Sequence, residues 1–165
     1  MTQTCSNKTH YFQCFEKLSK YPDLKEAVEE LAEVFEKAFE PHIAELIMRF
    51  YEEFKDDQAK CVTMIWTSEI KITGLINCAI VVDAVNTYGY DKAKFKYYFD
   101  KFKKLKVDYK DVLTNSMKFI RILSSCVVDK GTTYNDEDRV TYRGIHKDIM
   151  QDVEEGYTFR IINWM

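Results

Sequence analysis

An arginine and a glycine stand side by side in a short alternating segment near the end of the sequence, at Arg143 and Gly144. The surrounding residues 140–145 (Val-Thr-Tyr-Arg-Gly-Ile) alternate in the way that is typical of a strand. A guanidinium held on a strand can make two parallel hydrogen bonds to a phosphate, and the neighbouring glycine lets backbone and ligand approach closely. We therefore identify Tyr142, Arg143 and Gly144 as a candidate binding site for a diphosphate.

The same arginine has a simpler interpretation, in which it pairs with Asp136 or Glu137 of the preceding polar loop. A second acidic pair, Glu154 and Glu155, is adjacent in sequence, so the two side chains point in different directions on a helix or a strand. That pair is more typical of a solvated turn than of paired catalytic carboxylates. The sequence contains no glycine-rich phosphate loop and no zinc-protease or serine-hydrolase motif. The candidate chemistry is therefore concentrated at Arg143.

The histidines and cysteines are scattered, and no set of them has the spacing of zinc ligands. The cysteines form an odd set without a Cys-x-x-Cys pair, and no N-terminal apolar run resembles a signal peptide. No apolar stretch is expected to reach the roughly 18 residues of a membrane helix. We expect free, mostly buried thiols in a reducing, cytoplasmic setting, with no membrane partner and no metal. These residues are His10, His42, His146, Cys5, Cys14, Cys61, Cys78 and Cys126.

Lysines and aromatic residues are interleaved between Asp91 and Lys110, a mixture that could bind single-stranded nucleic acid. Helical spacing favours a different interpretation, with the rings on a core face and the lysines in water. The acidic face of a helix over 24–40 would be an internal counterpart for these lysines. The net charge of −3 adds no general attraction for nucleic acid, so we do not expect such a partner. The apolar face consists of Phe95, Tyr98, Phe99, Phe102 and Leu105.

The elements that must position Arg143 are mainly helical. Hydrophobic residues make up 46% of the 165 residues, which is enough for one domain with a hydrophobic core. The sequence contains only five glycines and two prolines, so extended disorder is not expected. Apolar residues recur at spacings of three and four, and Pro41 should break the pattern near Glu40. Residues 1–20 are expected to form a loose or partly docked arm. The expected helical segments are about 24–40, 41–55, 68–85, 91–106 and 109–128.

The pattern changes after Gly131, which stands where a glycine commonly follows a helix C-terminus. A polar loop leads to a strand at about 139–145, and a second strand is expected at about 157–163. We therefore predict an α+β fold, mainly α, in a single domain. Its parts are the arm (1–20), a helical region (21–130, with helices over about 24–128) and the start of a β region (131–165).

Several segments resemble one protein family. The stretch Trp66-Thr67-Ser68-Glu69-Ile70, followed by Leu75-Ile76-Asn77, is similar to a block that opens a helix in that family. The run Phe119–Ser125, the loop and the 140–145 strand resemble the elements that introduce its binding arginine, and Gly156 to Met165 looks like the approach to a second block. Residues 56–165 thus resemble the N-terminal portion of the arginine-type (R-S-E class) mono-ADP-ribosyltransferases.

The resemblance implies that Tyr142, Arg143 and Gly144 bind NAD, with Arg143 on its diphosphate. In the family, a Ser-Thr-Ser block then shapes the nicotinamide pocket and a later Glu-x-Glu supplies the catalytic carboxylate. Neither block occurs in these 165 residues, so no catalytic residue is assigned and the chain alone is expected to be inactive. A partner chain or a C-terminal half would complete the sheet, and a protein would be the acceptor of an active transferase. The alternative from another class is a non-catalytic helical protein–protein interaction module.

Overall fold

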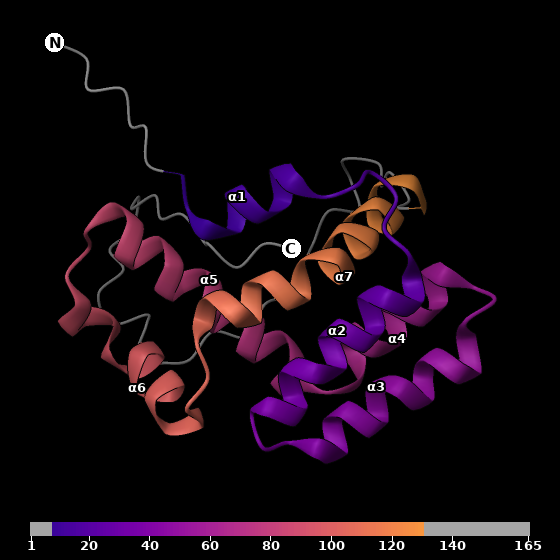
Figure 1. Cartoon of the computed structure of the whole chain (residues 1–165), viewed down its shortest axis with the longest axis horizontal. Helices are drawn as coiled ribbons and strands as arrows, with labels where there is room; N and C mark the ends of the chain where they lie inside the picture. Colours follow the sequence, from indigo (N-terminus) through magenta and orange to yellow (C-terminus); the bar gives the residue numbers. More distant parts are fainter. Residues whose placement is uncertain (1–7, 131–165) are drawn as a thin grey trace, which may run out of the picture.

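A computed structural model describes residues 8–130, in which every regular element is a helix (Figure 1). The long helix α7 crosses the centre of the molecule, with α2 packed along it and α5 against its other side. Helix α3 lies against α2, and α1 runs beside α7. The elements are α1 (His10–Lys17), α2 (Leu24–Lys37), α3 (Pro41–Phe54), α4 (Gln58–Ser68), α5 (Ile70–Tyr88), the 3₁₀ turn η1 (Lys92–Phe95), α6 (Lys96–Leu105) and α7 (Tyr109–Lys130).

The α+β class expected from the sequence is wrong for the part of the chain that the structure describes. Residues 8–130 contain helices and no strand, so this part is all-α. The physical reason is that its apolar residues repeat at three- and four-residue spacings and bury helical faces against one another. The two expected strands, at about 139–145 and 157–163, lie outside the described residues.

The boundary between α2 and α3 agrees with the helix break expected at Pro41. The Asp23 side chain caps α2 by accepting a hydrogen bond from the Glu26 amide at 2.9 Å. Phe39 then adopts a left-handed backbone with φ of 59°, and α3 begins at Pro41, where the missing N–H has no helical partner to lose. The acidic outer face of α2 is anchored to α7, because Lys118 Nζ lies 2.6 Å from Glu26 Oε1.

The lysine-rich segment forms η1 and α6, and its rings turn inward as helical spacing predicts. Phe102 is buried, and Tyr98, Phe99 and Leu105 pack against the core. The structure differs from expectation in the partner of the acidic helix α2. A lysine of α7, Lys118, approaches that helix through both Glu26 and Glu30.

Two helices were not expected from the sequence. Helix α1 forms within the segment expected to be a loose or partly docked arm, and it packs on α7 and α5. Helix α4 fills the interval between the helices expected at 41–55 and 68–85, where it buries Cys61, Val62 and Ile65. Its apolar residues are spread around the helix instead of forming one stripe, so their periodicity is weak in sequence.

Helix α5 carries apolar residues on nearly all sides, and the helices that pack around it bury most of them. Ten of its side chains are buried, from Ile72 to Val85. Contrary to the sequence expectation, its length and composition alone would allow it to cross a membrane, although 56% of the apolar window is buried inside the protein. A core helix meets the same criterion, and α5 packs against α7, α4 and α6.

A buried carboxylate on α5 holds the start of α1. Asp83 is 2% exposed, and its two oxygens accept hydrogen bonds from the His10 amide at 3.1 Å and the Tyr11 amide at 2.8 Å. The Thr9 hydroxyl accepts from the Phe12 amide at 3.3 Å. Three of the amides that a helix N-terminus leaves unpaired are thereby satisfied. Asp83 is thus a buried polar link between α5 and the start of α1.

Replacing Asp83 with alanine should release α1. The change leaves two backbone N–H groups without acceptors in a buried place, and we expect a loss of about 1–3 kcal/mol in the free energy of unfolding. Hydrogen exchange should show the earliest opening at the amides of residues 10–17. Asp83→Asn keeps the size but one oxygen only, so an intermediate loss is expected. Unchanged exchange in α1 after Asp83→Ala would contradict this role.

Gly74 lies inside α5 at a position that has room for a methyl group. A Cβ built there would meet only the end of the Lys101 side chain, at 3.8 Å. Alanine is the better helix former, so Gly74→Ala should stabilise the protein by roughly 0.5–1 kcal/mol in urea unfolding. Gly89 is the matched control, because its φ of +71° at the end of α5 strains any other residue, and Gly89→Ala should destabilise. Equal effects of the two changes on stability would contradict the conclusion that Gly74 tolerates a side chain and Gly89 does not.

Candidate functional site

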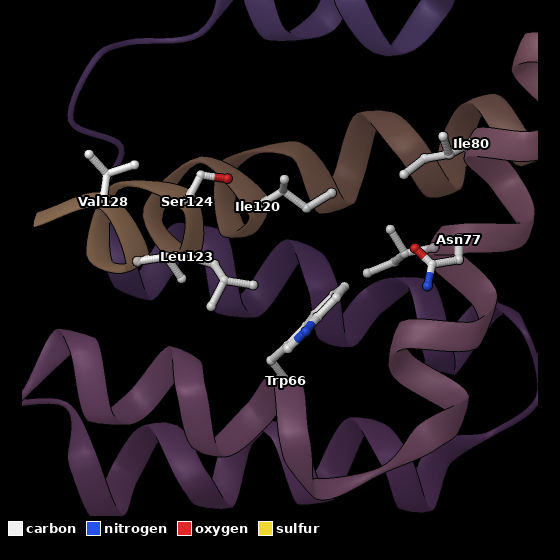
Figure 2. A pocket seen from close by; sticks show the side chains of 9 residues that line it. Trp66, Asn77, Ile80, Ile120, Leu123, Ser124 and Val128 are labelled. Atoms are coloured by element: carbon white, nitrogen blue, oxygen red, sulfur yellow. The ribbon is translucent and has the colours of Figure 1, made fainter. Parts of the chain in front are cut away.

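An apolar groove opens between α4, α5 and α7, at the C-terminal end of α7. Its volume is about 330 Å³, and no charged side chain lines it. Its floor is buried core, whereas Val127 and Val128 at its rim are 63% and 80% exposed. Figure 2 shows the Trp66 ring between the side chains of α7 and Asn77 of α5. The lining residues, called the apolar groove below, are Trp66, Ile76, Asn77, Ile80, Ile120, Leu123, Ser124, Val127 and Val128.

A tight connection between two helices places Trp66 in the groove. Helix α4 ends at Ser68, and Glu69 alone separates it from α5. The Glu69 side chain caps α5 by accepting from the Lys71 amide at 3.2 Å, so the chain turns sharply here. Trp66 then packs on Phe119 of α7, with ring centroids 6.5 Å apart. The end of α4 and the start of α5 therefore face the same stretch of α7.

The groove brings together the segments that carry the family resemblance in the described part. Trp66 comes from the first of them, Ile76 and Asn77 from the second, and Ile120, Leu123 and Ser124 from the third (Figure 2). The first two belong to one stretch, 66–77, and the third begins more than 40 residues later in the chain, so the fold brings these two stretches together. Asn77, Ser124 and the indole N–H of Trp66 contribute the polar side-chain atoms of an otherwise apolar surface. Such a surface is suited to an apolar partner, and it carries no arginine or lysine to balance the charge of a phosphate.

The site residues predicted from the sequence, Tyr142, Arg143 and Gly144, lie outside the described residues, as do their possible partners Asp136 and Glu137. The described part places the end of α7 at Lys130, beside the groove and ahead of these residues in the chain. The sequence did not single out the groove, because each lining residue is also what a helix core requires. The one available signal was the excess of apolar residues on α5 and at the end of α7.

A second, polar cluster links α1 to α7. His10 Nε2 lies 2.9 Å from Thr114 Oγ1 and 3.3 Å from the Cys14 sulfur. His10 also lines a hollow of about 240 Å³, together with Asp83. The pair His10 and Thr114 was not found from sequence, since 104 residues separate the two. Its contacts account for how α1 is oriented on α7.

The described cysteines are free thiols. Burial raises the pKa of the Cys61 thiol to about 11, with Asp57 adding to the shift, and burial also raises the pKa of Cys78. Both thiols therefore stay protonated at neutral pH and are poor nucleophiles. Within residues 8–130, no group of three or more His, Cys, Asp or Glu side chains is arranged to hold a metal ion.

Comparison of the chain with protein-family models, with curated proteins and with solved structures finds no match.

Proposed function

We propose that the chain is the NAD-binding N-terminal portion of a mono-ADP-ribosyltransferase. The observation that supports this most is that two family-like stretches, 66–77 and 119–125, line the same groove, the first through Trp66 and Asn77 and the second through residues 120–124 of α7. The groove also lies at the end of α7, from which the chain continues toward Arg143.

Arg143 would supply the contact with the diphosphate of NAD, and Gly144 would allow the backbone to come close to it. A guanidinium matches two phosphate oxygens with two parallel hydrogen bonds, which gives both affinity and orientation. The apolar groove itself contains no such donor, so it is not the place where the diphosphate binds. Its role in this proposal is to position the helical region against the rest of the protein.

The 165 residues contain neither Ser-Thr-Ser nor Glu-x-Glu, so they should bind NAD without transferring ADP-ribose. Saturation-transfer NMR on the full chain tests this division. We expect signals from NAD and ADP-ribose, which share the diphosphate, and none from nicotinamide alone. Binding of nicotinamide but not of ADP-ribose would contradict the assignment of Arg143 to the diphosphate.

A second candidate function, a non-catalytic interaction module, is favoured by the apolar character of the groove and by exposed Val127 and Val128. Exposed apolar patches of this kind often mark contacts between proteins. The ADP-ribose signal in the same NMR experiment distinguishes the two functions, because a pure interaction module has no reason to bind ADP-ribose. Binding of a protein to the groove together with no signal from ADP-ribose would favour this second function.

A further inference from the structure

The apolar groove remains open on one side within residues 8–130. Ile76 and Ile120 form part of a floor that is at most 3% exposed, yet Val127 and Val128 extend the apolar surface outward to the rim. Leaving such a surface in water costs free energy in proportion to its area. An apolar segment that seats on the groove would recover this free energy.

We infer that the groove is the docking site for the chain's own residues 157–165 (Tyr-Thr-Phe-Arg-Ile-Ile-Asn-Trp-Met), called the C-terminal segment below. Six of its nine residues are apolar or aromatic, and Arg160 is its single charged residue. In an extended backbone, Tyr157, Phe159 and Ile161 share one face and Arg160 lies on the other. One face of the segment therefore matches a groove that has no charged lining residue.

The rest of the sequence after α7 is a poorer match to the groove. Residues 131–156 carry seven acidic and three basic side chains, and their apolar residues are dispersed among these charges. A charged side chain seated in an apolar groove would lose its hydration without gaining a partner. The C-terminal segment is the stretch after Lys130 in which apolar residues are concentrated.

The geometry of the attachment also favours this occupant. Val127 and Val128 line the groove within three residues of Lys130, so the chain leaves α7 beside the site that it would return to. The intervening stretch 131–156 can span up to roughly 85 Å when extended, far more than the length of α7. A tethered segment is present at an effective concentration in the millimolar range, which favours it over a second copy or a dilute partner.

Docking would close residues 131–156 into a loop that begins and ends at the groove. Tyr142, Arg143 and Gly144 stand near the middle of that loop in sequence. The inference goes beyond NAD binding and does not rest on it, because it depends only on the groove and the composition of the segment.

Tryptophan quenching in the full chain tests the docking. The sequence contains two tryptophans, Trp66 and Trp164. The change Trp164→Phe leaves Trp66 in the groove as the single fluorescent reporter and keeps an aromatic ring in the C-terminal segment. In this background Ile161→Ser should shift the docked-to-open ratio about tenfold toward the open state, since it removes a buried aliphatic side chain. Acrylamide should then quench Trp66 more strongly. Val128→Ser, at the exposed rim, should have the same effect.

Arg160→Ser is the matched control and should leave the quenching of Trp66 unchanged, because Arg160 lies on the opposite face. Circular dichroism should show the same helix content in all variants, since none of the substituted residues belongs to the buried core of residues 8–130. Equal quenching in Ile161→Ser, Val128→Ser and the parent would overturn the inference. Protection of Trp66 that disappears on dilution would also overturn it, because it would identify a second copy as the occupant.

Discussion

Replacing Phe119 with alanine is expected to destabilise the protein by about 3–5 kcal/mol, the usual range when a buried aromatic ring is removed from a core. Phe119 is fully buried on α7 and packs on Trp66. Its removal would leave a cavity where α4 meets α7, and neighbouring helices could fill it only in part. The helices that α7 touches would all lose support, because this helix also contacts α1, α2 and α5. Urea unfolding followed by far-UV circular dichroism measures the loss.

The chain offers a matched control for this experiment at Phe12. The ring of Phe12 is 53% exposed, so Phe12→Ala removes the same atoms from a place that is still largely in water. We expect Phe12→Ala to cost about 1 kcal/mol or less. A loss below 1 kcal/mol for Phe119→Ala, or equal losses for both changes, would show that α7 is not the centre of the core.

Replacing Arg143 with alanine should weaken NAD binding by about tenfold to a hundredfold, the range expected when a hydrogen bond to a charged group is lost. The proposed contact is a fork of two N–H donors on the diphosphate, so both geometry and charge contribute. Arg143→Lys keeps the charge but not the fork, and it should recover only part of the affinity. Equilibrium dialysis with labelled NAD measures all three proteins. Full affinity in Arg143→Ala would contradict the contact.

Periodicity predicted several helices of the described part and failed at others for identifiable reasons. The apolar stripe of α2 and the break at Pro41 are local signals, so α2 and α3 could be predicted. Helix α1 is short and exposes much of its surface, and it is held by Asp83, which lies more than 70 residues away. No local pattern reveals such a contact. Helix α4 lacks a single apolar stripe, so its helical period is weak in sequence.

The fold class and the groove show two different limits of prediction from sequence. The α+β class was inferred from alternation after Gly131, yet the residues that the structure describes form helices only. The groove depends on how Trp66, Asn77 and Leu123 meet in space, and each of these residues alone is unremarkable on a core helix. The sequence could not indicate that these residues share one surface.

Calorimetric titration of NAD into the full chain is the most direct test of the central claim, that this chain binds NAD through Arg143. Wild type, Arg143→Ala and the control Arg160→Ala, which removes the same side chain elsewhere, should be titrated side by side. The proposal predicts measurable heat of binding for wild type and Arg160→Ala, and a much weaker response for Arg143→Ala. No binding by wild type, or the same affinity in all three proteins, would contradict it.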